Sequence, residues 1–288
     1  MRLRLSEAED RQRRVLAVHD ISCLGRCSLT VALPMLSAAG LETTLLPTAV
    51  LSTHTGGFEG YTYRDLVEDM DPIAAHWLGL GLRFDGVFTG WLGTHRHIAR
   101  MRRLMTAFAD GRPELIVDPV MGDNGRLYAT LDGDYVDAMR DFCGGASLLL
   151  PNLTEAALLT RTAYPGEDYG REDVLALLKA LRALGPETVV LTGVSLREGR
   201  IGAAAWDGEA LAYHDAPFIP GQWHGAGDVF ACAMLGARFA GKDAATALGF
   251  AVDFTARCIA RTRDAGTDER LGLQFEPELW RMTELVKG

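Results

Sequence analysis

The feature of this 288-residue sequence that most restricts its fold is a regular alternation of short apolar runs with longer amphipathic stretches. The apolar runs have the length of strands, and the stretches between them carry apolar residues at helical spacing. Strands that are apolar on both sides are typical of a parallel sheet with helices on both faces. We expect strands at 14–20, 43–49, 86–89, 114–118, 147–150 and 188–192, and helices at 29–39, 63–70, 72–82, 94–109, 134–143, 154–160, 171–184, 226–240, 243–261 and 275–287.

The alternation is interrupted once, late in the chain. Two short runs, 201–206 and 210–214, are joined by Asp207-Gly208, a pair typical of primed hairpin turns. No linker, repeat or low-complexity segment divides the sequence, so we predict one domain over residues 14–288. A charged leader, residues 1–13, precedes it and is a candidate for disorder. The expected fold class is therefore α/β, with three layers (α/β/α), a mostly parallel central sheet and a late β-hairpin.

Composition narrows the classes of function. The formal net charge of −9 disfavours a broad nucleic-acid surface. No apolar run has the length of a membrane span and the charged first residues contain no apolar signal core, so we predict a cytoplasmic protein with no membrane partner. The five cysteines are odd in number and scattered, which favours reduced thiols over a disulfide framework.

The segment Gly225-Ala226-Gly227-Asp228 precedes an apolar run of helical period, and it predicts a turn that leads into a buried helix. The first N–H groups of such a helix have no intrahelical partners and lie at the positive end of its dipole, so this turn can bind a phosphate. Asp228 falls in the first turn, where we expect it to stay ionised and to accept a proton from a hydroxyl group. Helix capping is the alternative interpretation of Asp228.

Polar residues follow most of the predicted strands, and the carboxyl ends of parallel strands meet at one edge of a sheet. Asp118, Glu155 and Asp228 carry carboxylates, and Asn152 and Thr192 lie at the same predicted edge. These side chains are suited to Mg²⁺ and a triphosphate. The sequence has no Walker A string and no G-x-G-x-x-G after its first strand, which argues against a P-loop protein and a NAD-dependent dehydrogenase.

Four segments occur in the order and spacing of the ribokinase-like superfamily: VDPVMGD at 117–123, PNLTEA at 151–156, LTG at 191–193 and GAGD at 225–228. Thr53-His54-Thr55-Gly56 and Gly90-Trp91 narrow the resemblance to the vitamin B6 kinases, and it covers about residues 14–261. The resemblance implies a ribokinase-like fold, and ATP-dependent phosphorylation of the 5′-hydroxymethyl group of pyridoxal, pyridoxamine or pyridoxine in pyridoxal phosphate salvage. It also implies Mg²⁺, K⁺ as a further candidate ion, and a homodimer.

The same resemblance implies roles for individual residues. Asp228 would be the catalytic base, with Gly225, Ala226 and Gly227 as the anion hole. The nucleotide would contact Asp118, Asn152, Thr192, Gly193 and Gly227, and Mg²⁺ would be organised by Asp118 and Glu155, partly through water. The pyridine ring would contact Asp20, Thr53, His54, Thr55 and Trp91. The loop at 122–128 is expected to be a mobile cover for the nucleotide.

Two residues depart from the B6 kinase pattern, which commonly has serine at the position of Asp20 and tyrosine at that of Trp91. An acid at Asp20 can accept a hydrogen bond from the ring hydroxyl or from a protonated ring nitrogen, and Trp91 can stack on the ring. Three alternatives stay open: a hydroxymethylpyrimidine kinase of thiamin synthesis, a sugar or nucleoside kinase, and a noncatalytic protein that binds pyridoxal phosphate or ATP. The presence of Asp228 and Glu155 favours a catalyst over the last of these.

Overall fold

The computed structural model describes residues 11–287, so residues 1–10 of the predicted leader and residue 288 lie outside it. The last residues of the leader lie against the domain. Arg11 donates two hydrogen bonds, of 2.8 and 2.6 Å, to the carboxylate of Asp85, and the guanidinium of Arg13 lies 5.8 Å from the ring centroid of Phe239.

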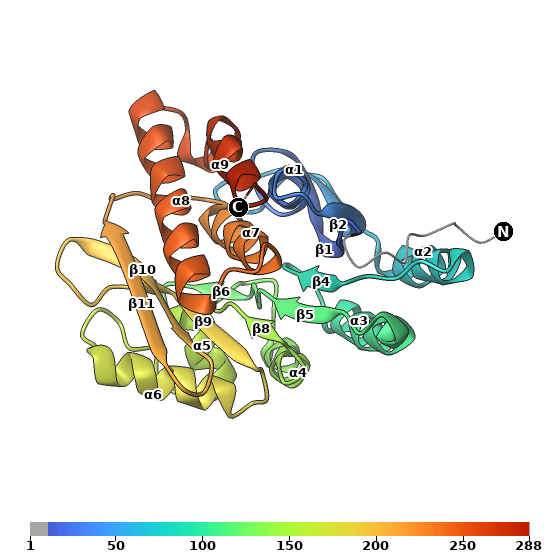
Figure 1. Cartoon of the computed structure of the whole chain (residues 1–288), viewed down its shortest axis with the longest axis horizontal. Helices are drawn as coiled ribbons and strands as arrows, with labels where there is room; N and C mark the ends of the chain where they lie inside the picture. The colour runs from blue at the N-terminus through green and yellow to red at the C-terminus, as the bar shows by residue number, and fades with distance from the viewer. Residues whose placement is uncertain (1–10, 288) are drawn as a thin grey trace.

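A nine-stranded sheet forms the middle layer, in the order β11-β10-β9-β8-β5-β4-β1-β2-β3 (Figure 1). Its strands are β1 (Arg14–Leu24), β2 (Glu42–Thr53), β3 (Tyr63–Asp65), β4 (Gly86–Thr89), β5 (Glu114–Val117), β8 (Leu148–Leu149), β9 (Thr188–Val194), β10 (Arg200–Trp206) and β11 (Leu211–Pro217). The inner pairs are parallel; β3 runs antiparallel to β2, and β10 runs antiparallel to β9 and β11. The predicted parallel sheet and late hairpin are confirmed.

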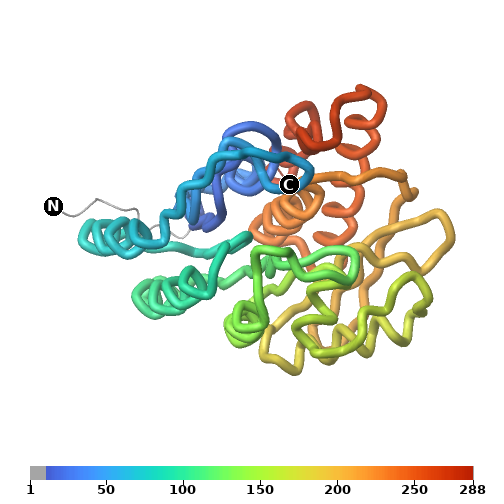
Figure 2. Tube along the Cα trace, turned by 180° about the vertical axis from the view of Figure 1, so that it is seen from behind, coloured from blue at the N-terminus to red at the C-terminus, as the bar shows by residue number. Residues whose placement is uncertain are grey.

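Helices cover both faces of the sheet, as the two opposite views show (Figures 1 and 2). One face carries α1 (Leu29–Ala38), α7 (Ala226–Phe239), α8 (Ala244–Ala265) and α9 (Leu279–Glu284); the other carries α2 (Val67–Leu80), α3 (His95–Ala107), α4 (Gly133–Cys143), α5 (Leu153–Thr160) and α6 (Arg171–Arg182). Alternate residues of β1 supply the two cores: Val15 and Ala17 pack on the α7 side, and Leu16 and Val18 pack on the α3 side. The predicted three-layer architecture is confirmed.

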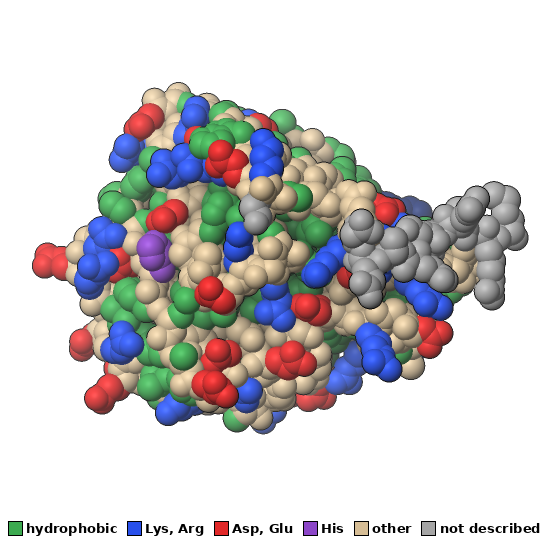
Figure 3. Space-filling model, viewed as in Figure 1, with side chains coloured by type: hydrophobic (Ala, Val, Ile, Leu, Met, Phe, Trp, Pro, Cys, Tyr) green, Lys and Arg blue, Asp and Glu red, His purple; other side chains and the backbone are tan. Residues whose placement is uncertain are grey.

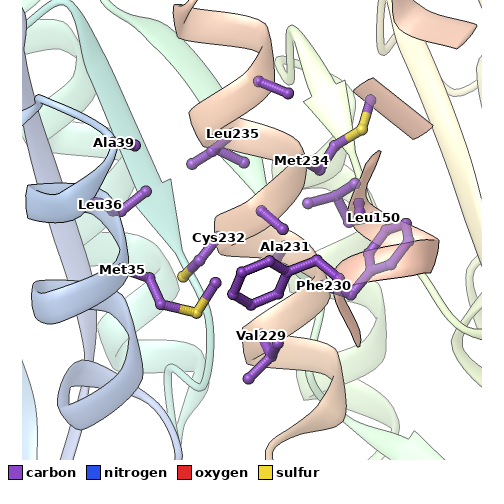
Figure 4. Close-up of a cluster of buried hydrophobic side chains, with 14 of the residues drawn as sticks. Met35, Leu36, Ala39, Leu150, Val229, Phe230, Ala231, Cys232, Met234 and Leu235 are labelled. Carbon is purple, nitrogen blue, oxygen red and sulfur yellow. The ribbon is translucent and has the colours of Figure 1, made fainter. Parts of the chain in front are cut away.

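Helix α7 is buried along nearly its whole length because small residues let its neighbours approach. Met35 and Leu36 of α1 lie toward Cys232 of α7 (Figure 4). A Cβ added at Gly236 would lie 2.7 Å from Cε of Met282 and 3.0 Å from Cβ of Ala39, so glycine lets both neighbours pack closely here. Close packing on these sides gives the N-terminus of α7, which carries Asp228, a defined position in the molecule.

The structure corrects two local predictions near the sheet edges. The segment predicted as a helix at 63–70 instead begins with β3, and α2 then runs unbroken through Pro72. Proline removes one backbone hydrogen bond, but the buried Val67, Met70 and Ala74 hold the helix on the sheet. Asp207-Gly208 is not a two-residue turn, because pairing stops at Trp206 opposite Leu211 and leaves a four-residue loop.

Segment ends also differ from the predictions. β1 extends to Leu24 and β2 to Thr53, so Thr53 ends a strand rather than lying in a loop. The helix predicted at 275–287 is a 3₁₀ turn, Glu276–Glu278, followed by the short α9. Pro277 lies in the first turn of this segment, where the missing N–H costs nothing, so it does not explain the 3₁₀ geometry.

The surface carries mixed charge. Basic and acidic side chains are interspersed over the face shown in Figure 3, a distribution unlike the single-signed patch of a nucleic-acid-binding protein. Within residues 11–287, no helix combines the length and the apolar character that crossing a membrane requires.

Candidate active site

A cavity of about 450 Å³ lies where α7 begins, at the carboxyl ends of the parallel strands. Most of the predicted site residues line it together: Trp91, Asp118, Asn152, Glu155, Thr192, Gly193, Gly225, Ala226, Gly227 and Asp228. They come from segments far apart in the sequence, and the sheet topology alone brings them to one edge. Asp20, Thr53, His54 and Thr55 do not line the cavity.

Asp228 lies in the first turn of α7, and its side chain is 15% exposed. Burial raises its pKa to about 7; the nearby carboxylate of Asp20 adds to this rise, and a backbone hydrogen bond from Ser28 opposes it. Desolvation therefore outweighs the helix N-terminus, and the expectation that Asp228 stays ionised remains a prediction for the complex with its ligands. A carboxylate with a pKa near neutrality is a stronger base than an exposed one.

The turn before Asp228 leaves backbone N–H groups facing the cavity. Gly225 has φ of 75°, and a Cβ there would lie 2.2 Å from the carbonyl oxygen of Arg26. A Cβ added at Gly227 would meet no heavy atom within 4 Å, since this residue opens toward the cavity. The first helical hydrogen bond after the turn runs from Val229 N to Gly225 O, and Ala226 N already donates to Trp223 O at 3.2 Å. The N–H groups of Gly225 and Gly227, which have no such backbone partner in the described part of the chain, are left for an anion, whereas the predicted contribution of Ala226 N would require it to leave Trp223 O.

Four carboxylates line the cavity, from Asp118, Asp123, Glu155 and Asp228, and the lining contains no lysine or arginine. Burial raises the pKa of Asp118, and the charges of Glu155 and Asp228 raise it further. Among the described residues, no hydrogen bond donor contacts the Asp118 carboxylate, so its charge has no protein partner. A cation would offset this repulsion.

Glu155 is held by the start of α5. Its Oε2 accepts from Asn152 N at 2.9 Å and its Oε1 accepts from Met121 N at 3.1 Å, while Asn152 Oδ1 accepts from Glu155 N at 2.9 Å. This is a capping box, so the helix-start interpretation of these residues holds alongside their place in the cavity. Burial raises the pKa of Glu155 to about 7.

The acidic residues fit a magnesium ion held mainly by other oxygens. No three His, Cys, Asp or Glu side chains of the described chain lie close enough to one another to hold an ion by themselves. Mg²⁺ usually keeps several waters and binds one or two carboxylates together with phosphate oxygens. Asp118, which has no other partner, is suited to direct contact, and Glu155, whose oxygens already accept backbone N–H groups, is suited to contact through water.

Glu155→Gln is expected to raise the Mg²⁺ concentration needed for half-maximal activity several-fold and to remove part of the capping box. An amide has one acceptor oxygen where the carboxylate satisfies two N–H groups, so part of the capping box is lost, at a cost of about 1 kcal/mol. A Mg²⁺ titration and thermal unfolding measure the two effects. The matched control is Asp173→Asn, which removes the exposed capping acid that accepts from Gly170 N on α6; an equal change in its Mg²⁺ titration would contradict the role of Glu155.

The predicted cover segment forms a small ribbon, β6 (Gly122–Asp123) and β7 (Arg126–Leu127). Asp123 and Tyr128 from this segment line the cavity, as the cover prediction requires. The ribbon is tied to the start of α5, since Asn152 Nδ2 donates to Gly122 O at 2.9 Å and Gly125 N donates to Thr154 Oγ1 at 2.9 Å. Its predicted mobility stays a prediction.

One half of the cavity is apolar, and its lining residues were not predicted from the sequence. Its lining comes from the β10–β11 hairpin, the segment after it and α8: Ile201, Gly202, Ala216, Pro217, Phe218, Ile219, Trp223, Val252, Thr255, Ala256 and Ile259. The polar atoms of two of these are already engaged, since Trp223 Nε1 donates to Ile219 O and Thr255 Oγ1 donates to Ala251 O. The spacing 252, 255, 256 and 259 on one helix face was the signal that could have revealed this half.

The residues predicted to contact a pyridine ring are only partly brought together. Trp91 lines the cavity, and Asp20 lies behind Ser28, whose Oγ donates to Asp20 Oδ1 at 2.5 Å. His54 has both ring nitrogens engaged: Nδ1 accepts from Gly56 N, and Nε2 lies 2.6 Å from Arg270 O. Thr53 lies at the end of β2, and Thr55 is exposed. Substrate contacts by Asp20, Thr53, His54 and Thr55 stay predictions.

Comparison with known proteins gives a consistent result. The family model described as phosphomethylpyrimidine kinase matches residues 43–271. Pyridoxal kinase PdxY of Granulibacter bethesdensis is 26% identical over 274 residues, which cover 92% of this chain and 95% of that protein. The crystal structure of a putative phosphomethylpyrimidine kinase from Bacteroides thetaiotaomicron, in a form with pyridoxal, is 34% identical with a TM-score of 0.89, covering 94% of this chain and 96% of that one.

Pyridoxal kinase from Lactobacillus plantarum is similar to the same degree: it is 33% identical with a TM-score of 0.86, and the match covers 95% of this chain and 97% of that one. These matches extend over both the polar and the apolar halves of the cavity. The chain belongs to the phosphomethylpyrimidine kinase family, has the ribokinase-like fold of its pyridoxal kinase relatives, and is a phosphotransferase.

Proposed function

We propose that this protein transfers the terminal phosphoryl group of ATP to the 5′-hydroxymethyl group of a vitamin B6 vitamer, pyridoxal, pyridoxamine or pyridoxine, and so serves pyridoxal phosphate salvage. The observation that carries the proposal is the position of Asp228, a buried carboxylate beside the Gly225–Gly227 turn in a cavity that also holds Asp118 and Glu155. The pyridoxal kinases among its relatives, and the relative crystallised with pyridoxal, support the choice of alcohol.

The residues supply the parts that phosphoryl transfer needs. Asp228 accepts the proton of the substrate hydroxyl as its oxygen attacks the terminal phosphorus and the bond to ADP breaks. The N–H groups of Gly225 and Gly227, which have no backbone acceptor in the turn, donate to the phosphoryl oxygens, on which negative charge is spread during transfer. Asp118, and Glu155 through water, would hold Mg²⁺, which would supply positive charge to offset that of the phosphates. Asn152, Thr192 and Gly193 lie on the same edge and would contact the nucleotide phosphates.

The two halves of the cavity suit the two ends of the nucleotide. The acidic edge and the glycine turn take the triphosphate with its ions, so the apolar half formed by the hairpin and α8 is left for the purine ring. Trp91 follows β4, and strands β5, β8 and β9 lie between β4 and that hairpin. At this distance from the apolar half, Trp91 can stack on a pyridine ring.

We further propose a cytoplasmic homodimer, with K⁺ as a candidate second cation.

Hydroxymethylpyrimidine is the second candidate alcohol, and one observation favours it. The family description names the same chemical class. Asp20 does not decide between the two rings, because its carboxylate accepts from the hydroxyls of Ser22 and Ser28 and lies outside the cavity lining. Both alcohols carry a hydroxymethyl group on an aromatic ring, so the catalytic proposal is common to them.

An ATP-consumption assay with pyridoxal, pyridoxamine, pyridoxine and hydroxymethylpyrimidine tests the function, with Asp228→Asn as the control for contaminating activity. We expect kcat/KM to be highest for a B6 vitamer. A value at least tenfold higher for hydroxymethylpyrimidine than for every vitamer would replace the conclusion with the second candidate, since tenfold is about 1.4 kcal/mol of discrimination. Nucleotide binding without turnover of any alcohol would indicate a noncatalytic protein.

A further inference from the structure

His19 is a fully buried histidine that no part of the assigned chemistry uses. It lies in β1, its exposed fraction is 0%, and neither ring nitrogen has a hydrogen-bond partner. A buried polar group without a partner lowers the stability of the folded protein, so its presence calls for an explanation. Packing alone does not provide one, because an aliphatic side chain would fill the space without this cost.

The surroundings of the ring are arranged around it. A Cβ at Gly90, which follows β4, would lie 2.1 Å from Nδ1 and 2.3 Å from Cε1 of His19, so only glycine at this position leaves room for the ring. The ring of Phe88 packs against it at a centroid distance of 4.4 Å, edge to face. These two neighbours hold the imidazole in one orientation.

In that orientation the ring faces the proposed base. His19 follows Val15 and Ala17 in the alternation along β1, so it points to the face of the sheet that carries α7. His19 Nδ1 lies 4.0 Å from Oδ1 of Asp228. The distance is too long for a hydrogen bond, which requires about 3.2 Å or less. Catalytic hydrogen bonds are often long without substrate and shorten in the complex, so a movement of about 1 Å would complete this one.

The imidazole is neutral. Burial lowers its pKa to about 3, so the pair is not an ion pair near neutral pH. A neutral ring carries one N–H, and a carboxylate beside Nδ1 favours the proton on that nitrogen. A charged partner would stabilise the carboxylate of Asp228 and make it a weaker base, whereas a neutral donor can orient the same carboxylate with less loss of basicity.

We propose that His19 is a positioning residue for the phosphoryl transfer: its Nδ1–H donates to Oδ1 of Asp228 in the substrate complex and directs the other carboxylate oxygen toward the alcohol. Gly90 is required for this role because it gives the ring its place. The inference rests on the proposed function of Asp228 as base and adds to it a residue that does not touch the substrate.

A matched pair of variants tests the proposal. His19→Asn keeps an N–H donor at the position of Nδ1, and His19→Leu has nearly the same shape as asparagine but no donor. We expect the leucine variant to lose about 10- to 100-fold in kcat, the range that misplacement of a reacting group produces, while KM for ATP stays within about twofold. The asparagine variant should stay within about threefold of wild-type kcat. Gly90→Ala should displace the ring and lower kcat as leucine does.

Stability and nucleotide binding are measured on the same variants, as the shift in unfolding temperature that ADP produces. An ADP shift equal to that of the wild type, together with the loss of kcat in the leucine variant alone, supports the positioning role. Equal kcat values for the asparagine and leucine variants would overturn it, because packing would then explain both. A wild type that phosphorylates none of the four alcohols would instead overturn the proposed function, and this proposal with it.

Discussion

Asp228→Asn is expected to lower kcat by about 10²- to 10⁴-fold, the contribution typical of a general base, with little change in KM for ATP. Asparagine keeps the shape of the side chain but cannot accept the hydroxyl proton. Steady-state kinetics at saturating ATP with the preferred alcohol measure the effect. Turnover within a few-fold of wild type would reject Asp228 as the base.

The same variant should be more stable than the wild type at high pH. The pKa of Asp228 is raised from its usual value of 3.8 to about 7, so between these values the folded protein binds a proton that the unfolded chain has released. The wild type therefore loses stability as pH rises from about 4 to 7, at about 1.4 kcal/mol for each pKa unit, and asparagine does not titrate. We expect a gain of a few kcal/mol at pH 8 and almost none at pH 4.

Chemical unfolding of both proteins at the two pH values, without nucleotide or Mg²⁺, gives this difference. The control is Asp141→Asn, in which an exposed acid is changed; its effect should be small and should not grow in the same way with pH. If Asp228→Asn were instead less stable than the wild type at pH 8, the folded protein would stabilise the ionised Asp228 carboxylate, and the raised pKa would be contradicted.

Gly225→Ala should destabilise the protein and abolish phosphate binding, whereas Gly227→Ala should reduce binding alone. At Gly225 the positive φ and the Arg26 carbonyl 2.2 Å from an added Cβ both exclude alanine, and such strain costs about 1–3 kcal/mol or more. At Gly227 an added Cβ meets nothing within 4 Å, and alanine in a helix is favoured over glycine by about 1 kcal/mol. The methyl group there would point to the space of the phosphate.

Unfolding temperature with and without ADP separates these effects. Gly225→Ala should lower the temperature for the free protein by several degrees, since about 1 kcal/mol corresponds to about 2–4 °C in a protein of this size. Gly227→Ala should leave it unchanged or raised, and the increase produced by ADP should be smaller. Full stabilisation of Gly227→Ala by ADP would mean that the phosphates do not bind at this turn.

The sequence predicted most of the sheet and the polar half of the cavity because both depend on local patterns. Apolar runs indicate buried strands, and parallel strands necessarily place Asp118, Asn152 and Thr192 at one edge. Helix α2 could not be predicted through Pro72, because tertiary packing outweighed the local signal. The pKa of Asp228 and the unpartnered ring of His19 were likewise beyond the sequence, since both depend on how many atoms from distant segments exclude water.

The apolar wall of the cavity is also part of the protein's interior. Leu150, Ala216, Phe230 and Val252 line the cavity and belong to the same buried cluster that joins α7 and α8 to the sheet. A substitution that reshapes this wall would therefore weaken the fold as well, whereas Trp91 lines the cavity and belongs to neither buried cluster. During evolution of this fold, substitutions would therefore change the accepted alcohol more readily than the nucleotide that donates the phosphoryl group.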